Sequence, residues 1–194
     1  MMVKICGITT REDAVASTEA GASALGFNFC RQSPRFIQPD KALEIGRGLS
    51  VLKVGIFVDE SPARVAEIAK IAEIDIVQLH GSEDPSQFVP LRVWKAYRVT
   101  NGWSAETLNA ATAEAFLLDG PAPGTGASFD WSVARSLNQR IILAGGLGPE
   151  NVAEAIRQVR PWGVDACSRL ESAPGIKDHE RVRRFIRAAV TESL

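Results

Sequence analysis

Short apolar segments alternate along this chain with longer segments in which apolar residues recur at helical spacing. The short segments are nearly continuous in Val, Ile, Leu and Phe, which is typical of parallel strands buried on both faces. Strands are predicted at Val3–Cys6, Ala24–Phe29, Leu52–Val58, Asp75–His80, Val93–Val99, Ala115–Asp119, Ile141–Ala144 and Val164–Cys167. Helices are predicted at Arg11–Glu19, Asp40–Gly48, Pro62–Ala72, Asp130–Leu137, Pro149–Val159 and His179–Val190, with one or two turns in Asp84–Val89 and Ser104–Ala110.

Eight strands that alternate with about eight crossovers form the pattern of an α/β protein of the (β/α)8, or TIM, barrel type. The 194 residues leave about 24 residues for each of eight units, which is too few for a second domain or long insertions. We therefore predict a single (β/α)8 barrel domain over residues 1–194. An open, doubly wound sheet is the structural alternative, because alternation alone does not prove that the sheet closes.

The composition narrows the classes of partner. Hydrophobic residues make up 45% and charged residues 23%, as in ordinary globular proteins. With 22 Lys and Arg against 23 Asp and Glu, no basic excess is available for nucleic acid or anionic lipid. No apolar segment approaches the roughly 18 residues of a transmembrane helix, and the N-terminus enters a strand without a signal-peptide pattern. We expect a cytoplasmic protein with no nucleic-acid or membrane partner.

Three cysteines, Cys6, Cys30 and Cys167, lie far apart in the sequence and form no CxxC motif. This spacing argues against a disulfide framework and against a zinc site, and it suits a reducing compartment. We expect no metal.

Polar residues occur near the carboxyl ends of several predicted strands. In a barrel these ends carry the functional loops, and residues two apart in a strand share a face. A lumen that only needed filling would not require polar side chains, so this end is the candidate site. The residues concerned are Lys4 and Cys6 on the first strand, Gln78 and His80 on the fourth, Asp119 at the end of the sixth, and Asp165 and Cys167 on the eighth.

Each candidate also has an ordinary structural role to weigh. Cys6 is followed by Gly7 and a helix start, and a nearby helix N-terminus favours a thiolate. Cys30 and Cys167 are interpreted as small buried hydrophobic residues. Asp119 precedes a segment rich in Gly and Pro and would serve equally well to cap a turn. His80 is interpreted as a supporting residue rather than an acid or base.

Glycine-rich loops give a second signal. Gly145 and Gly146 follow the seventh strand and precede a predicted helix, so that backbone N–H groups can face an anion. In many barrels the loops after strands 7 and 8 hold a phosphate, and Ser168-Arg169 follows strand 8. Gly124-Thr125-Gly126 follows strand 6. Ordinary helix-capping glycines are the alternative, but together the loops predict a phosphorylated small molecule as ligand.

These segments, in this order, resemble the phosphoribosylanthranilate isomerase family of tryptophan biosynthesis. The Lys-Ile-Cys-Gly opening, combined with Gln-Leu-His-Gly and the late glycine pair, is highly specific. The resemblance extends from residue 3 to Lys177-Asp178, nearly the whole chain. The matching stretches are Lys4-Ile5-Cys6-Gly7-Ile8-Thr9, Gly26-Phe27, Ser33-Pro34-Arg35, Val54-Gly55-Ile56-Phe57-Val58, Val77-Gln78-Leu79-His80-Gly81, Leu117-Leu118-Asp119, Gly124-Thr125-Gly126, Phe129-Asp130-Trp131, Leu143-Ala144-Gly145-Gly146-Leu147 and Gly163-Val164-Asp165.

The resemblance implies an Amadori rearrangement of N-(5'-phosphoribosyl)anthranilate by acid–base catalysis, without a cofactor or metal. It places the general base on Cys6, the general acid on Asp119, and a contact to the anthranilate carboxylate on Arg35. A monomer or weak homodimer is expected. The other implied substrate-binding residues are Gly124, Gly126, Gly145, Gly146, Asp165, Ser168 and Arg169, with Lys4, Gln78 and His80 in supporting positions.

One segment departs from the family. After strand 8 the family often has Ser-Ser-Gly-Val-Glu, where this chain has Cys167-Ser168-Arg169-Leu170-Glu171. Arg169 either adds a cation to the phosphate site or points to solvent. Two other functions stay open: a related barrel isomerase of histidine biosynthesis, which uses an Asp where Cys6 stands, and a phosphate-binding barrel without catalysis.

Overall fold

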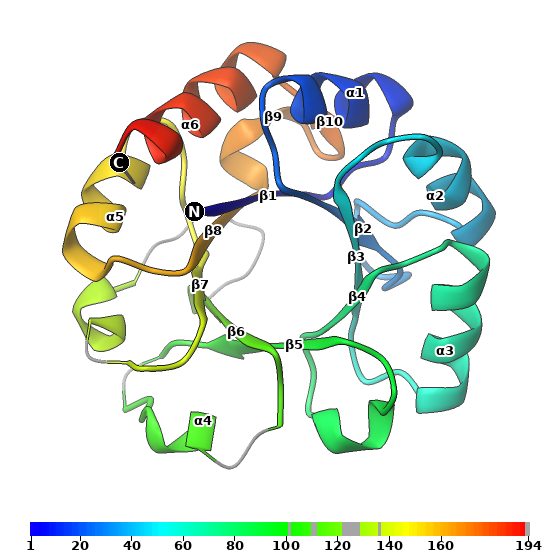
Figure 1. Ribbon diagram of the computed structural model, residues 1–194, viewed down its shortest axis with the longest axis horizontal. Helices are drawn as coiled ribbons and strands as arrows, with labels where there is room; N and C mark the ends of the chain where they lie inside the picture. Colours follow the sequence, from blue (N-terminus) through cyan, green and yellow to red (C-terminus); the bar gives the residue numbers. More distant parts are fainter. Residues whose placement is uncertain (101, 110–111, 122–128, 136, 193–194) are drawn as a thin grey trace.

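Eight parallel strands close into a barrel in the computed structural model, which describes residues 1–100, 102–109, 112–121, 129–135 and 137–192 (Figure 1). The barrel closes where the first strand pairs with the last, in the register Lys4 to Asp165 and Ile5 to Ala166. The predicted TIM barrel is confirmed and the open sheet is excluded. The strands are β1 (Met2–Cys6), β2 (Ala24–Asn28), β3 (Leu52–Phe57), β4 (Ile76–Leu79), β5 (Val93–Arg98), β6 (Ala115–Asp119), β7 (Ile141–Leu143) and β8 (Gly163–Ala166).

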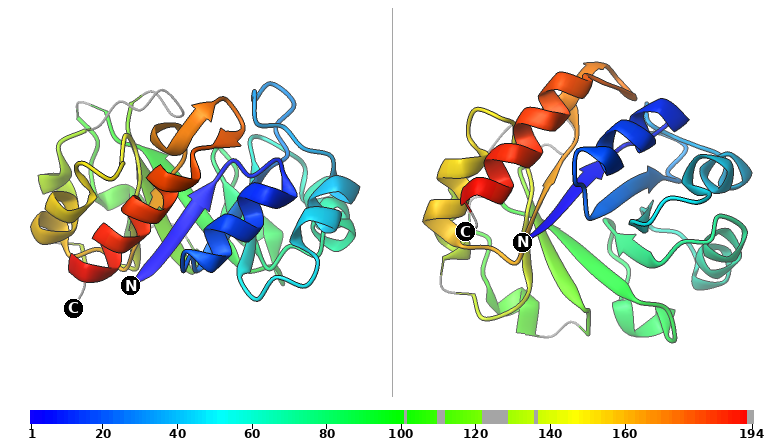
Figure 2. Two further views of the ribbon diagram at one scale, coloured as in Figure 1. Left: turned by 90° about the horizontal axis from the view of Figure 1, so that it is seen from above. Right: turned by 45° about the horizontal axis from the view of Figure 1, so that its top comes forward.

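Helices surround the barrel on the outside (Figure 1). Figure 2 shows the C-terminal helix α6 running beside β1, and α6 packs against α1 and α5. The α-helices are α1 (Arg11–Glu19), α2 (Pro39–Gly46), α3 (Pro62–Ile71), α4 (Glu106–Asn109), α5 (Val152–Val159) and α6 (His179–Glu192). Single turns of 3-10 helix occur at η1 (Pro85–Phe88), η2 (Trp131–Ala134) and η3 (Ser168–Leu170).

Two predicted helices are shorter than their sequence pattern. The helix expected from Asp130 is the single 3-10 turn η2, where Asp130 accepts a hydrogen bond from the Ser132 N–H at 2.9 Å. The helix expected from Pro149 begins only at Val152. Before it, the Asn151 side chain accepts from the Gly148 N–H at 2.8 Å and donates to the Gly146 carbonyl at 3.0 Å. The glycines after β7 therefore belong to a turn and not to a helix N-terminus.

A small hairpin that the sequence pattern did not predict follows β8. Its strands β9 (Glu171–Ala173) and β10 (Ile176–Lys177) pair antiparallel and join through Gly175, whose φ is 82°. Strands of three and two residues are too short to show a period of two. In the left view of Figure 2 the hairpin lies at the end of the barrel toward which the strands run, so it flanks the mouth.

The apolar core has two layers. One fills the space between the strands and the helices. The other fills the lower lumen, where the fully buried Trp94 meets Trp162 edge-on at 5.9 Å between ring centroids. Side chains of the same parity continue from this inner layer to the carboxyl ends of the strands. The polar side chains of the mouth therefore rest on a closed apolar floor.

Candidate active site

The buried ion pair of Lys4 and Asp165 joins β1 to β8 inside the barrel. Lys4 is 0% exposed, and its Nζ lies 3.0 Å from Asp165 Oδ1. Burial disfavours the ammonium, but the Asp165 carboxylate and the Cys6 sulfur outweigh burial and raise the pKa of Lys4. A permanent cation therefore lies two residues before Cys6 on β1, on the same face of the strand.

Cys6 and Cys167 form a pair of thiols above this ion pair. The last paired residues of β1 and β8 are Ile5 and Ala166, and Cys6 and Cys167 are the next residues along these two segments. A hydrogen bond from Cys167 lowers the pKa of Cys6 to about 7; burial opposes this shift and the Lys4 charge adds to it. The same hydrogen bond, together with burial, raises the pKa of Cys167 well above its usual value. Cys167 also donates to Glu171 Oε1 at 3.7 Å and accepts from Lys177 Nζ at 3.8 Å, so it belongs to the polar network of the mouth and differs from the inert small residue that the sequence suggested.

Asp119 ends β6 and is half-buried at the same mouth. Burial raises the pKa of its carboxyl to about 6, and the Asp165 charge adds to the shift. The hydrogen bond that Asp119 Oδ1 accepts from the Gly120 N–H, at 2.8 Å, opposes it. A carboxyl with this pKa still carries a proton in part of the population near neutral pH, as a general acid must.

The loop after β7 approaches Asp119 closely through Gly145. Its φ is 75°, and a Cβ there would lie 2.3 Å from the Gly120 nitrogen and 3.1 Å from Asp119 Oδ1. Only glycine fits that space and that backbone conformation. Gly146, with a φ of 66°, continues the turn.

The loops after β7 and β8 lie side by side, as a shared phosphate site requires. A Cβ on Gly148 would lie 3.2 Å from the Cβ and Cδ of Arg169, so the Arg169 stem runs along the β7 loop while its side chain is exposed. Ser168 is half-buried at the start of η3. Gly124 and Gly126 lie outside the described residues.

Arg35 enters the mouth from the loop after β2, held by Glu171. The guanidinium donates from Nε at 2.8 Å and from Nη2 at 2.7 Å to the two carboxylate oxygens. Glu171 also accepts from Lys177 Nζ at 2.9 Å. Burial alone would raise the pKa of Glu171, but Arg35 and Lys177 lower it to about 2. Arg35 is therefore fixed in position, and its Nη1 has no hydrogen-bond partner in the described part of the chain.

His80 follows β4 and is half-buried, with its ring against the fully buried Gln78. Gln78 Nε2 and His80 Nε2 lie 2.5 Å apart. Burial, together with the positive charges of Lys4, Lys95 and Arg98, lowers the pKa of His80 to about 3. With the Gln78 amide as donor, the neutral ring holds its proton on Nδ1. His80 can therefore donate a hydrogen bond but does not titrate near neutral pH.

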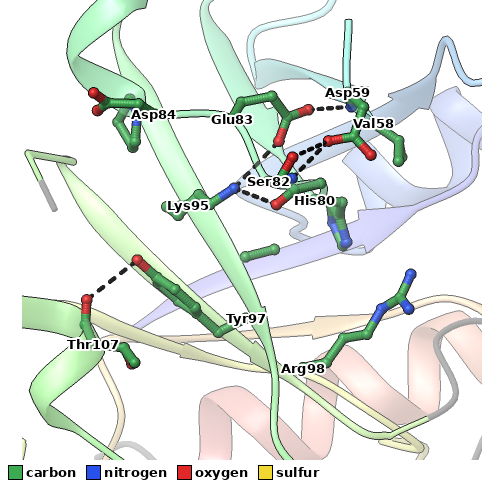
Figure 3. Close-up of a pocket in the computed structure, with 13 residues that line it drawn as sticks. Val58, Asp59, His80, Ser82, Glu83, Asp84, Lys95, Tyr97, Arg98 and Thr107 are labelled. Atoms are coloured by element: carbon green, nitrogen blue, oxygen red, sulfur yellow. Dashed lines mark hydrogen bonds and ion pairs between the residues drawn. The ribbon is translucent and has the colours of Figure 1, made fainter.

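A hollow of about 580 Å³ extends the mouth over the ends of β3, β4 and β5 (Figure 3). On one side, Lys95 donates to the Gly81 carbonyl at 2.6 Å and pairs with Glu83 at 3.2 Å, which ties the loop after β4 to β5. On the other side lie His80 and Arg98. Sequence reasoning missed Arg98, although two-residue alternation from the buried Trp94 and Ala96 points to it.

The described part of the chain lacks a metal-binding cluster and a membrane-spanning helix. No group of three or more His, Cys, Asp or Glu side chains gathers there in a metal-binding arrangement. No helix in those parts of the chain has the length and apolar character needed to cross a membrane.

Comparison with known proteins agrees with this geometry. The family model for N-(5'-phosphoribosyl)anthranilate (PRA) isomerase matches residues 3–188. The N-(5'-phosphoribosyl)anthranilate isomerase of Solibacter usitatus is 50% identical over 194 residues, covering 97% of each chain. The crystal structure of phosphoribosyl anthranilate isomerase from Thermus thermophilus superposes with a TM-score of 0.92 at 37% identity, covering 98% of this chain and 99% of the other.

A further solved structure holds a ligand. It is phosphoribosyl anthranilate isomerase in complex with reduced 1-(o-carboxyphenylamino)-1-deoxyribulose 5-phosphate, with a TM-score of 0.88 at 38% identity, covering 98% of this chain and 99% of that one. Sequence and structural similarity therefore span the same, nearly complete length of the chain. This chain belongs to the N-(5'-phosphoribosyl)anthranilate isomerase family.

Proposed function

We propose that this chain converts N-(5'-phosphoribosyl)anthranilate into 1-(o-carboxyphenylamino)-1-deoxyribulose 5-phosphate in tryptophan biosynthesis, with Asp119 as general acid and Cys6 as general base. One observation carries the proposal. A thiol of lowered pKa and a carboxyl of raised pKa stand on the same face of one barrel mouth. These opposite shifts favour the thiolate and the protonated carboxyl together, which are the two forms that the rearrangement needs.

The first step is the opening of the ribose ring. Protonated Asp119 gives its proton to the ring oxygen, the bond from that oxygen to C1 breaks, and the anilinic nitrogen forms an iminium with C1. Burial is the main reason that Asp119 keeps this proton. Transfer by a positioned acid of this kind contributes about 10²- to 10⁴-fold in rate.

The second step is proton removal from C2. The iminium withdraws electrons from C2, so a base as modest as a thiolate can take this proton. The Cys6 thiolate is stabilised by Cys167 and Lys4. The resulting enolamine then tautomerises to the aminoketose, and no net oxidation or reduction occurs. Asp165, paired with Lys4, keeps that cation below the thiolate.

The two anionic ends of the substrate would bind to different groups of the mouth. Backbone N–H groups around Gly145, Gly146 and Ser168, with the Arg169 cation beside them, suit the phosphate. Arg35, oriented by Glu171, has Nη1 left to donate to the carboxylate of the anthranilate ring. The contacts of Gly124 and Gly126 with the substrate stay a prediction.

The test is turnover of freshly made N-(5'-phosphoribosyl)anthranilate, followed by its loss of fluorescence. Cys6→Ser and Asp119→Asn are each expected to lower kcat by about 10²- to 10⁴-fold while circular dichroism still shows a folded barrel. Cys30→Ser is the matched control, because Cys30 contacts Gln32 on the loop after β2 and has no proposed role. Full activity of either site variant would refute the proposed roles.

The same assay decides between this function and the two alternatives. Tight binding of the reduced product analogue without turnover would indicate a phosphate-binding barrel. Turnover of the aminoimidazole substrate of histidine biosynthesis would indicate a second activity. Cys6 argues against that activity, because such sites use paired Asp residues, and the family match supports the first function.

We also propose a cytoplasmic enzyme that is a monomer or weak homodimer. Both proposals have physical support. Cys6, Cys30 and Cys167 are free thiols, as a reducing compartment maintains them. The exposed large apolar side chains of the described residues belong to six different segments of the chain and not to one strand or helix face: Met1, Val58, Ile71, Val89, Ile176 and Val190. Cell fractionation and sedimentation test the two statements.

A further inference from the structure

Arg98 occupies a position from which its side chain enters the catalytic mouth. It is the last residue of β5 and is in register with Asp119, the last residue of β6. It shares its strand face with Trp94 and Ala96, which belong to the apolar layer inside the lumen. The alternation of the strand therefore directs Arg98 to the inner face at the carboxyl end, beside the proposed general acid.

The Arg98 guanidinium carries a charge that the protein leaves without a partner. No hydrogen bond or ion pair joins it to another residue in the described ranges, and no dashed line reaches it in Figure 3. Three other cations near the mouth are engaged, Lys4 with Asp165, Arg35 with Glu171, and Lys95 with Glu83, whereas Arg169 is the cation already assigned to the proposed phosphate site. An arginine on the inner face of an enzyme mouth with no protein partner is available to bind an anion.

The surroundings of Arg98 determine which part of a ligand lies there. The hollow of about 580 Å³ over β3, β4 and β5 includes Arg98, His80 and the half-exposed apolar side chain of Val58. Its three carboxylates have partners in the protein: Asp59 accepts from Ser82, Asp84 accepts from Ser86, and Glu83 pairs with Lys95 (Figure 3). The lining side chains that remain for a ligand are the apolar Val58, the neutral imidazole of His80 and the cation of Arg98. This combination suits an aromatic ring that carries a carboxylate.

We propose that Arg98 binds the aryl carboxylate of the substrate and so selects for an anthranilate and against a plain aniline. This inference rests on the proposed function and adds a specificity-determining residue to it. The proposed phosphate site is at β7 and β8, and β6 with Asp119 lies between these strands and β5, so we assign the second anion of the substrate to Arg98. Glu171 occupies Nε and Nη2 of Arg35, so Arg35 keeps only Nη1 for a ligand, whereas the whole guanidinium of Arg98 is available.

The test measures binding and needs no turnover. Calorimetry gives the Kd of the reduced product analogue and of its phenyl counterpart, which lacks the carboxylate, for wild type and Arg98→Met. A lost charge-assisted hydrogen bond should weaken binding of the carboxylated analogue by about 10- to 100-fold and leave the phenyl analogue within about twofold. Arg98→Lys keeps the charge without the planar fork and should fall between the two. Arg187→Met, on the exposed outer side of α6, is the matched control.

Equal losses for both analogues would overturn the proposal, because they would show that Arg98 acts on the fold or through Asp119. No loss for either analogue would overturn it as well. Failure of the proposed function is separate, since it would show as absent turnover by wild type whatever the binding result. Arg98 is exposed and unpaired, so Arg98→Met should keep the melting temperature of wild type, and circular dichroism checks this.

Discussion

The hydrogen bond from Cys167 to the Cys6 thiolate predicts a distinctive pH profile for the free enzyme. With the proposed roles of the two residues, the value of kcat/KM depends on the fraction of enzyme with Cys6 deprotonated and Asp119 protonated. The pKa of Cys6 is about 7 and that of Asp119 about 6. Asp119 is thus a stronger acid than Cys6, so most of the enzyme has lost the Asp119 proton before Cys6 is deprotonated. At the optimum, about pH 6.5, only about 6% of the enzyme carries both correct forms.

Removal of the Cys167 thiol should move one limb of this profile and not the other. In Cys167→Ala the pKa of Cys6 rises, and its ordinary value of 9.0 is the reference point. At that value the acid limb stays near pH 6, the alkaline limb moves from about 7 to about 9, and the correctly protonated fraction falls to about 0.1%. The maximum of kcat/KM therefore drops by up to about 60-fold, whereas above about pH 9 the two enzymes converge.

Rate measurements from pH 5 to 10, with the ultraviolet absorbance of the thiolate followed in parallel, check this expectation. Cys167→Ser keeps a donor and should lie closer to wild type, and Cys30→Ser should match wild type. A loss of rate that is uniform across the pH range would refute the reasoning, because it would mean that Cys167 supports the loop after β8 and does not tune Cys6.

Three further predictions follow from charges at the mouth. Arg169→Ala should raise KM about tenfold with little change in kcat, and an unchanged KM in steady-state assays would show that Arg169 points to solvent. Glu171→Gln should lower the melting temperature at neutral pH. The pKa of Glu171 is lowered from 4.5 to about 2, so its contribution to stability is complete above about pH 4.5 and is lost as the pH falls toward 2. The melting temperatures of the two proteins should therefore converge between pH 4.5 and 2. Replacing Lys4 and Asp165 together by Met and Leu should widen the kcat/KM profile at both limbs and lower its maximum, and a profile of unchanged width would contradict this.

The barrel was predictable because its strands are buried on both faces, which produces nearly continuous apolar segments. The same alternation predicts that Lys4, Cys6, Asp119 and Asp165 lie on the inner face of the barrel. Helix ends were less predictable, since the turn from Gly146 to Asn151 depends on side-chain hydrogen bonds that have no periodic signal.

Contacts between distant segments could not be predicted from local patterns. Cys167 was set aside as an ordinary buried thiol, because its role depends on closure of the barrel, which places β8 beside β1. Glu171 and Lys177 belong to a hairpin too short to have a pattern, yet they fix Arg35, which is more than 130 residues away in sequence. Arg98 was within reach of the alternation argument, but a single arginine at a strand end has no motif around it.

The buried ion pair adds to the two larger effects, the Cys167 thiol at Cys6 and burial at Asp119, that shift the pKa values of the proposed base and acid. Lys4 and Asp165 act on both catalytic groups, but not equally. At Cys6 the lowering by Lys4 exceeds the raising by Asp165, whereas at Asp119 the raising by Asp165 exceeds the lowering by Lys4. The pair is therefore an oriented dipole that brings the two pKa values toward each other, the thiol downward and the carboxyl upward. An ion pair that moved both pKa values by the same amount in the same direction would shift the pH profile without changing the largest fraction of enzyme that is correctly protonated. The orientation of the pair, and not its charge alone, therefore contributes to catalysis.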